Sequence, residues 1–391
     1  MPEKMKIGFF TTTYYPTPDG VSHYLRDVKH ELEQRGHEVH VFSFNGDRNE
    51  RNVHIPATVP FPVYPQYNMP VNPFPMYLYK LARKIGFDVI HIHDPFMGSI
   101  GYRLAKAAKI PIIATFHTDF VRMQESLKMP FKNTLFRLSW RYNSYLYRKC
   151  DLVLVPSLKT MEYLKENGIE NTEELPLFVD TWKYNSCEKS FHPFIVQYLG
   201  RITRDKGVFR ILDVAQAVGK SDEIRFIISG TGPDADNLVR EAEKKGLMNM
   251  ITFTGYVDEK KKIDLLSSAN LFIYPSDTDT FGISVLEAMS SGLPAIIPEG
   301  FPLIHYDGND DSGLIVSDFS RPETIARRIE ELRKDPERLA TLNTAARSFA
   351  VDNFSKQKHC DRLISIYEHF MGSNKNPGKE VTHKKRQPQQ I

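Results

Sequence analysis

Two cations follow a predicted strand in the second half of the chain and could bind a phosphate group. Arg201 and Lys206 lie in the sequence LGRITRDKG, directly after the apolar run at 194–200. Arginine presents a planar fork of N–H donors and lysine a compact positive charge, and both bind phosphate oxygens. The pair therefore suits a diphosphate. The alternative is an ordinary solvated basic loop, in which Arg204 also faces water.

A second group of candidates lies in DTDTFGISVLEAMSSGLP, after the predicted strand at 270–276. The chain turns at Phe281 and Gly282 and enters a helix at about Ile283, so a helix N-terminus with partial positive charge follows the strand. Glu287 lies in that helix, and its carboxylate can accept hydrogen bonds from both hydroxyls of a diol such as ribose. The alternative is a surface helix with a solvated glutamate, which the closely packing run AMSSGLP disfavours.

The first half of the chain offers two weaker candidates. Gly20 separates the predicted strand at 6–10 from a helix, where a glycine lets the backbone approach a ligand closely. An ordinary turn glycine explains it equally well. His117 ends the predicted strand at 110–116 and could face a sugar, although a lone histidine is more often structural.

Three other patterns point to different chemistry. GTGPDA at 230–235 fits a dinucleotide-binding turn, but no acidic residue ends the next predicted strand, so NAD binding is disfavoured. Asp277 and Asp279 form an Asp-x-Asp pair that could hold a metal, yet nearby cations can neutralise phosphate without one. His91 and His93 share a strand face but lack an evident third ligand. We therefore predict no metal site and no required cofactor.

The elements that must position these residues alternate between short apolar strands and helical segments. This pattern is typical of parallel sheets with both faces covered by helices. Ligands of such sheets bind at the carboxyl ends of the strands, where the candidate residues lie. The predicted strands are 6–10, 37–44, 88–94, 110–116, 151–157, 194–200, 224–230, 250–256, 270–276 and 294–300.

We predict an α/β fold with two Rossmann-like, doubly wound domains that face each other across a cleft. The N-terminal domain is expected at 1–180 and the C-terminal domain at 181–354, because the apolar periodicity is lost near 178–193. A helix at 355–372 is expected to pack back across the junction. The remaining residues, 373–391, contain too few apolar side chains to fold and are predicted to form a disordered basic tail.

Composition excludes several classes of protein. The 391 residues are 41% hydrophobic and 25% charged, as in a soluble globular protein, and the formal net charge is +3. Five cations and one anion in 373–391 account for that charge, so the body is nearly neutral and nucleic acid is not an expected partner. The three cysteines lie far apart, which indicates reduced thiols in a cytoplasm. No signal peptide and no apolar run of about 18 residues is evident.

The ordered motifs resemble the retaining glycosyltransferases of family 4, which have the GT-B fold. The resemblance covers about 6–370 and is strongest between Gly200 and Gly292, in GR–K–G, SGTGP, FTGYV and PSDTDTFGISVLEAMSSGLP. It implies a metal-independent hexosyltransferase that moves a hexose from a donor of the UDP-glucose or GDP-mannose type to a hydroxyl acceptor. The N-terminal domain would lie on the acceptor side, and the C-terminal domain would bind the sugar nucleotide.

The resemblance also implies roles for individual residues. Arg201 and Lys206 would bind the donor diphosphate, and Glu287 the ribose. Asp279 would contact the transferred sugar. The implied catalytic residues are His117, Arg201, Lys206 and Asp279, and the other implied donor-binding residues are Gly20, Gly230, Gly255, Tyr256, Val257, Phe281, Gly282, Ile283 and Glu287, with 255–257 lining the base.

The chain departs from the family pattern at three places. Asp279 replaces the usual glutamate and is one methylene shorter. The loop often read as Asn-Gly-Val-Asp is LFVD at 177–180, and the expected Gly-Gly is EGFP at 299–302. Because the last loop lies near the sugar in the family, the identity of the donor sugar is open.

The acceptor is suggested by the stretch 120–149, which is rich in cations and aromatic side chains. Such a composition suits the surface of an anionic membrane and resembles family members that glycosylate lipids. We therefore expect a cytoplasmic protein that binds peripherally at the inner face of the membrane. The alternative is a core-packed helix pair with solvated charges.

Three other functions remain open at this stage. They are a sugar-nucleotide 2-epimerase, a transferase acting on soluble polysaccharides or small sugars, and a catalytically silent sugar-nucleotide-binding regulator. The donor base, the linkage position and the oligomeric state are not determined by the sequence.

Overall fold

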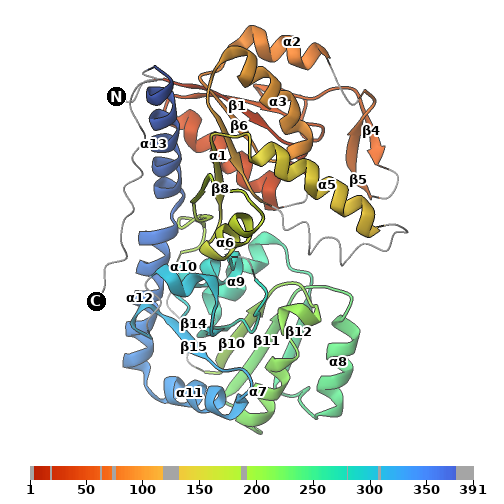
Figure 1. Cartoon of the computed structure of the whole chain (residues 1–391). Coiled ribbons are helices and arrows are strands. Elements are labelled where there is room, and N and C mark those ends of the chain that lie inside the picture. Colours follow the sequence, from red (N-terminus) through yellow and green to blue (C-terminus); the bar gives the residue numbers. More distant parts are fainter. Residues whose placement is uncertain are drawn as a thin grey trace. The chain divides into compact units, whose positions relative to one another are not determined.

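A computed structural model describes residues 4–17, 20–61, 64–72, 76–117, 132–185, 192–279, 281–306 and 310–375 (Figure 1). These residues divide into two compact units. Unit 1 comprises the described residues of 1–155, 163–173 and 360–375, and unit 2 those of 156–162 and 174–359. One of the three cysteines, Cys187, lies outside the described residues, as do the predicted tail beyond 375 and 118–131 of the basic aromatic stretch.

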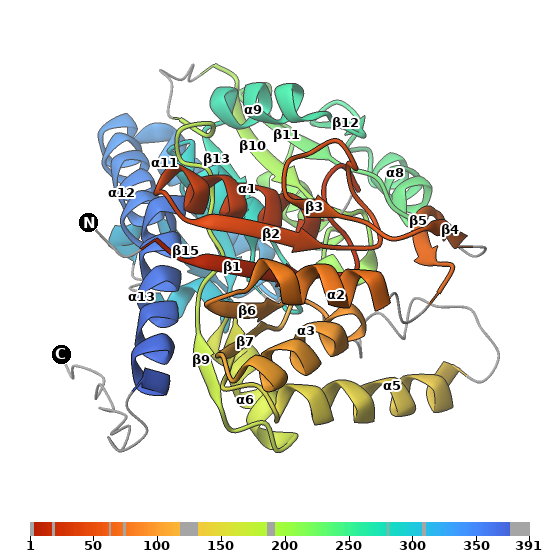
Figure 2. The same ribbon diagram turned by 90° about the horizontal axis from the view of Figure 1, so that it is seen from above.

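Unit 1 is built on a seven-stranded sheet in the order β3-β2-β1-β6-β7-β8-β9. The strands are β1 Lys6–Phe10, β2 Glu38–Phe42, β3 Val53–His54, β6 Val89–Ile92, β7 Ile112–Thr115, β8 Leu152–Val155 and β9 Thr172–Glu174. The helices are α1 Gly20–Gln34, α2 Met76–Ile85, α3 Pro95–Ala108, α5 Lys132–Tyr147, α6 Leu158–Glu166 and α13 Lys356–Lys375, the last two being shared between the units. Right-handed crossovers on either side of β1 place α1 on the opposite face from α3 and α5 (Figure 2).

A small antiparallel pair, β4 Thr58–Phe61 and β5 Tyr64–Pro70, stands apart from the main sheet of unit 1. The sequence pattern did not predict these strands or the short strands β3 and β9. Prolines interrupt the apolar alternation in 56–75, which hides strand periodicity.

Unit 2 is built on a six-stranded parallel sheet in the order β12-β11-β10-β13-β14-β15. The strands are β10 Phe194–Leu199, β11 Ile224–Ser229, β12 Ile251–Gly255, β13 Leu271–Ile273, β14 Ala295–Pro298 and β15 Leu314–Ser317. The helices are α7 Arg210–Val218, α8 Ala235–Lys244, α9 Glu259–Ser268, α10 Ile283–Ser290, α11 Pro322–Lys334 and α12 Pro336–Phe354, with 3-10 turns η1 Arg204–Lys206, η2 Pro302–Tyr306 and η3 Asp310–Ser312.

The strand order determines which loops meet. In each unit the order reverses beside the first strand, between β1 and β6 in unit 1 and between β10 and β13 in unit 2. Ligands of doubly wound sheets bind at such a reversal, beyond the carboxyl ends of the strands. In unit 2 the loops that follow β10 and β13 carry Arg201, Lys206 and Asp279 and are therefore neighbours. The prediction of two α/β units with parallel sheets is confirmed.

The helix that follows β10 does not begin directly after the strand, because a tight turn intervenes. Lys206 ends η1, and Gly207 follows with a φ of 67°, so α7 starts only at Arg210. A Cβ atom on Gly207 would lie 2.2 Å from the carbonyl oxygen of Pro275. Glycine thus lets the loop after β10 pack directly on the loop after β13.

Within the described part of the chain, no helix combines the length and apolar character that a membrane span requires.

Candidate functional site

The loop after β10 is held rigidly by backbone hydrogen bonds. Gly200 N donates to Ser229 O at 3.1 Å and Ile202 N donates to Thr231 O at 2.9 Å. The hydroxyl of Tyr198 donates to the carbonyl oxygen of Arg201 at 2.9 Å. The backbone that carries the Arg201 guanidinium is therefore fixed, while the residue itself is exposed.

Lys206 and Asp279 form an ion pair across the two loops, with 2.7 Å between Lys206 Nζ and Asp279 Oδ2. The Tyr274 hydroxyl donates to the same oxygen at 2.7 Å, and Phe281 N donates to Oδ1 at 3.0 Å. Burial raises the pKa of Asp279, but the Lys206 ammonium and these hydrogen bonds outweigh it and hold the pKa below its ordinary value of 3.8. The structure thus unites two predicted catalytic residues and adds Tyr274, which sequence reasoning missed.

Replacing Asp279 with asparagine is expected to lower the free energy of unfolding by about 2–4 kcal/mol at pH 7, since Lys206 loses its buried partner. A carboxyl group whose pKa is lowered by folding stabilises the fold fully when the pH is above its pKa in the unfolded chain. That stabilisation disappears as the pH falls through the folded pKa. Urea unfolding at pH 7 and near pH 3 should therefore show a difference between wild type and variant that shrinks in acid.

Asp277 supplies a matched control for that measurement. Its carboxylate pairs with Arg210 at 2.6 Å, but the side chains are 50% and 41% exposed, so Asp277→Asn should change stability little. Equal losses for Asp277→Asn and Asp279→Asn would contradict the special role of the buried pair. Both carboxylates of the Asp-x-Asp pattern are paired with cations.

The entrance to α10 is set by Gly282, whose φ of 92° is in the left-handed region. A Cβ atom there would lie 2.4 Å from Cζ of Phe301, so the EGFP loop packs directly on this turn. Phe281 is buried and contacts Phe354 edge-on, with 5.7 Å between ring centroids. Ile283 is exposed at the first turn of α10. Phe281 can therefore offer a ligand only its backbone, whereas Ile283 can offer its side chain.

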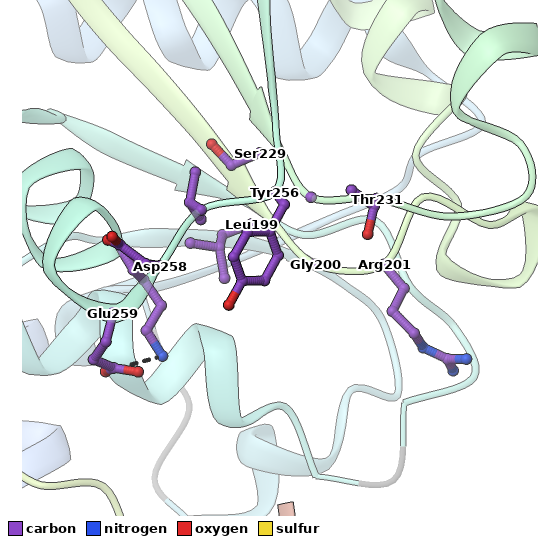
Figure 3. A pocket seen from close by; sticks show the side chains of 11 residues that line it. Leu199, Gly200, Arg201, Ser229, Thr231, Tyr256, Asp258 and Glu259 are labelled. Atoms are coloured by element: carbon purple, nitrogen blue, oxygen red, sulfur yellow. Dashed lines mark ion pairs between the residues drawn. The ribbon is translucent and has the colours of Figure 1, made fainter. Parts of the chain in front are cut away.

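A cavity of about 270 Å³ lies at the carboxyl ends of the strands of the unit 2 sheet (Figure 3). Of the predicted residues, Arg201, Gly230, Tyr256 and Val257 line it. Tyr256 is 79% exposed, so its ring can stack on a flat base. Figure 3 shows Arg201 on one side of Tyr256, with Asp258 and Glu259 on the other. The cavity thus has a cationic end suited to phosphates and a polar end suited to a nucleoside.

Gly230 is required by the packing of the chain itself. Its φ is 137°, its N–H donates to Gly255 O at 2.9 Å, and a Cβ atom on it would lie 1.8 Å from the carbonyl oxygen of Gly200. The Gly-Thr-Gly turn is therefore explained by the close approach of two strand ends, without a dinucleotide.

Gly230→Ala is expected to lower the free energy of unfolding by roughly 2–4 kcal/mol, or to prevent folding, because of this contact and the strained φ. Gly20→Ala is the control, since a Cβ atom on Gly20 would meet nothing within 4 Å. Its stability should stay within about 0.5 kcal/mol of wild type. Denaturant unfolding measures both, and a stable Gly230→Ala protein would refute this account of the turn.

Glu287 is mostly buried, with its side chain 13% exposed. Its Oε1 atom lies 2.7 Å from Lys262 Nζ and accepts a hydrogen bond from the Tyr184 hydroxyl at 3.0 Å. The alternative of a solvated surface glutamate is therefore wrong. Sequence reasoning missed both partners. Lys262 is one of three consecutive lysines, and Tyr184 lies where the apolar periodicity is lost, so neither carries a signal in the sequence.

In unit 1, His117 lies among other polar rings at the carboxyl end of the sheet. Its Nε2 atom is 3.1 Å from Nδ1 of His93, and its ring centroid is 5.1 Å from that of Tyr24 on α1. Because α1 begins at Gly20, the structure brings His117 close to the helix that carries the predicted glycine. Burial, helped by His91 and His117, holds the pKa of His93 well below its ordinary value.

His91 is also engaged in hydrogen bonds, with Thr115 Oγ1 at 2.7 Å and Tyr367 OH at 2.5 Å. Among the residues that the structure describes, no group of three or more His, Cys, Asp or Glu side chains could hold a metal ion.

Two family models match the chain. The model of the glycosyl transferases group 1 matches residues 186–349, and the model of glycosyltransferase family 4 matches residues 18–183. Together they cover most of the chain and meet at the segment between the two sheets.

Similar proteins match almost the whole chain. An alpha-monoglucosyldiacylglycerol synthase of Acholeplasma laidlawii is 25% identical, covering 95% of this chain and 98% of that protein. A GDP-mannose-dependent alpha-mannosyltransferase of Mycobacterium tuberculosis is 26% identical, covering 94% and 97%.

Solved structures show the same fold. The crystal structure of Anabaena HepE in complex with UDP has a TM-score of 0.72 at 18% identity, covering 93% of this chain and 100% of that one. A glycosyltransferase from Rickettsia africae has a TM-score of 0.72 at 17% identity, covering 94% and 99%. The predicted GT-B fold is thereby confirmed.

Proposed function

Because the chain belongs to the family 4 glycosyltransferases, we propose that it transfers a hexose from a nucleoside diphosphate sugar to a hydroxyl acceptor, with retention of configuration. The observation that carries this proposal is the arrangement at the carboxyl edge of the unit 2 sheet. There a cavity with a cationic end is lined by Arg201, and Lys206 and Glu287 lie on the neighbouring loops and helix.

The cations act on the leaving group. As the glycosidic bond to phosphate breaks, the anomeric carbon gains oxocarbenium character and the diphosphate gains negative charge. Arg201, Lys206 and the N-terminus of α10 are preorganised to stabilise that charge. The acceptor hydroxyl attacks from the face that the leaving group vacates, forms the new glycosidic bond and passes its proton to the departing diphosphate oxygen. In this proposal Gly20 approaches the phosphates and His117 the sugar.

Asp279 is proposed to orient Lys206 and to border the sugar. Both of its oxygens accept hydrogen bonds from the protein, and its short side chain keeps it at the turn into α10. A sugar hydroxyl can still donate to the remaining lone pair of Oδ1.

The donor is proposed to carry glucose or mannose. One relative is named a monoglucosyldiacylglycerol synthase and the other a GDP-mannose-dependent mannosyltransferase. The first name favours a glucosyl donor, for which we propose UDP-glucose, and the second favours GDP-mannose, so these are the first donors to test. They also favour transfer over the epimerase reaction, which needs no acceptor.

The acceptor is proposed to be a lipid at an anionic membrane surface on the cytoplasmic side. On one face of α5, the side chains of Leu146 and Tyr147 are buried in unit 1. The outer face is exposed and carries Arg137, Leu138, Arg141, Tyr142, Tyr145, Arg148 and Lys149. Cations interleaved with apolar and aromatic side chains on one face bind anionic bilayers.

The test is a donor-consumption assay with UDP-glucose and GDP-mannose, with and without vesicles that contain phosphatidylglycerol and diacylglycerol. A transferase releases UDP or GDP and forms a glycolipid. An epimerase alters the donor without an acceptor, and a silent regulator binds nucleotide without turnover. Either of the last two outcomes would overturn the proposal.

A charge reversal on α5 tests the membrane surface. Arg137→Glu combined with Arg141→Glu is expected to weaken the affinity for phosphatidylglycerol vesicles, measured by co-sedimentation, by at least about thirtyfold, since two cations are lost and each cation near such a surface contributes about 1 kcal/mol. Binding to neutral phosphatidylcholine vesicles should be weak for both proteins. Unchanged binding to anionic vesicles would show that this face is not the docking surface.

A further inference from the structure

The partners of Glu287 suggest how the nucleoside end of the cavity is organised. Both contacts of the carboxylate, from Lys262 Nζ and from the Tyr184 hydroxyl, fall on Oε1. Among the described residues, no hydrogen bond to Oε2 is present. One oxygen is thus anchored to the protein, which leaves the other available to a ligand.

The anchors are themselves fixed to the unit. Ser290 Oγ, on the same helix as Glu287, donates to the carbonyl oxygen of Tyr184 at 2.7 Å. Arg347 on α12 donates to that same carbonyl and to the carbonyl oxygen of Ser290. These hydrogen bonds fix the backbone at Tyr184 to α10. The Tyr184 hydroxyl and the Glu287 carboxylate are therefore held in a constant relative position.

Lys262 is shared with a second carboxylate. Its Nζ atom lies 3.3 Å from Glu259 Oε1, and Glu259 also contacts Lys183 at 2.9 Å and accepts from Tyr184. Lys262 and Glu259 both line the cavity, and Glu287 lies directly behind this lining, in contact with Lys262. Because Lys262 separates two anions, its removal would let them repel each other and shift Glu287.

We propose that Lys262 and Tyr184 are positioning residues that present the free oxygen of Glu287 to the ribose hydroxyls of the donor nucleotide. This inference rests on the proposed function, since it assumes that the cavity holds a nucleoside diphosphate. It assigns the pair a specific effect, which is selectivity for ribose over deoxyribose.

The experiment uses calorimetric titration of the full-length protein with UDP and GDP, and with dUDP and dGDP, which lack the 2′-hydroxyl. Lys262→Met is expected to weaken binding of the preferred ribonucleotide about tenfold to a hundredfold, as for a lost hydrogen bond to a charged group. Its effect on the deoxy form should be several-fold smaller. Lys262→Arg, which keeps the charge, should restore much of the affinity.

Controls separate positioning from folding. Lys261→Met removes an exposed cation from the adjacent position of α9 and should bind like wild type. In a Glu287→Gln background, Lys262→Met should add little, because coupled residues are not additive. If Lys262→Met fails to fold, Tyr184→Phe keeps the ring and removes only the hydroxyl, with the same selective loss expected.

The outcomes distinguish this inference from the proposed function. Wild-type affinity in both Lys262→Met and Tyr184→Phe, or equal losses for ribose and deoxyribose nucleotides, would overturn the inference while transfer activity stands. A wild-type protein that binds neither UDP nor GDP would overturn both.

Discussion

Replacing Lys206 with alanine is expected to lower kcat/KM for hexosyl transfer by about a hundredfold to a thousandfold, as for one preorganised group that stabilises developing charge. The loss should appear mainly in kcat, because the charge on the leaving diphosphate is greatest in the transition state. Initial rates of UDP or GDP release measure it. Near-wild-type turnover would remove Lys206 from the catalytic machinery.

Two controls sharpen that result. Arg204 is in the same turn, but its side chain is 70% exposed and its ion pair with Asp234 is long, at 3.9 Å. Arg204→Ala should therefore leave the rate nearly unchanged. Lys206→Ala also leaves the Asp279 carboxylate without its cation. The double variant Lys206→Ala, Asp279→Asn removes that uncompensated charge, so a rate that recovers above that of Lys206→Ala would show that the unpaired carboxylate, and not the loss of a cation from the phosphate, caused the defect.

Replacing Glu287 with glutamine is expected to weaken donor binding by about tenfold to a hundredfold, since hydrogen bonds to a charged group contribute about 1.5–3 kcal/mol. The effect should fall mainly on KM, because the ribose does not change during the reaction. Titration with UDP and GDP measures the loss directly. Lys262 keeps Glu259 as a partner in this variant, so folding should survive.

A distant glutamate provides the comparison for Glu287. Glu243→Gln on α8 makes the same chemical change at an exposed position and should not alter donor affinity. If Glu287→Gln behaves like Glu243→Gln, the ribose contact lies elsewhere. A fall in kcat for Lys206→Ala would locate the phosphate end of the site at Lys206. A rise in KM for Glu287→Gln would independently locate the nucleoside end at Glu287.

The local sequence determined much of the architecture. Apolar runs such as 194–199 and 224–229 were predictable as strands, because short apolar runs bounded by turn residues fit a parallel sheet covered on both faces. The turn at Gly282 and the helix that carries Glu287 were also predictable, since glycine, helix start and helix period all act within a few residues. The motif order between Gly200 and Gly292 then indicated the family.

The tertiary structure decided which side chains meet. Lys206 and Asp279 are 73 residues apart, and Tyr184 and Glu287 are 103 apart. The first contact depends on β10 lying beside β13. The second depends on the position of Tyr184, whose carbonyl oxygen accepts a hydrogen bond from Arg347. Periodicity reports which face of an element is apolar, but not which polar side chain a neighbouring loop brings to it. Lys262, indistinguishable in sequence from the two lysines before it, acquires its role only through that packing.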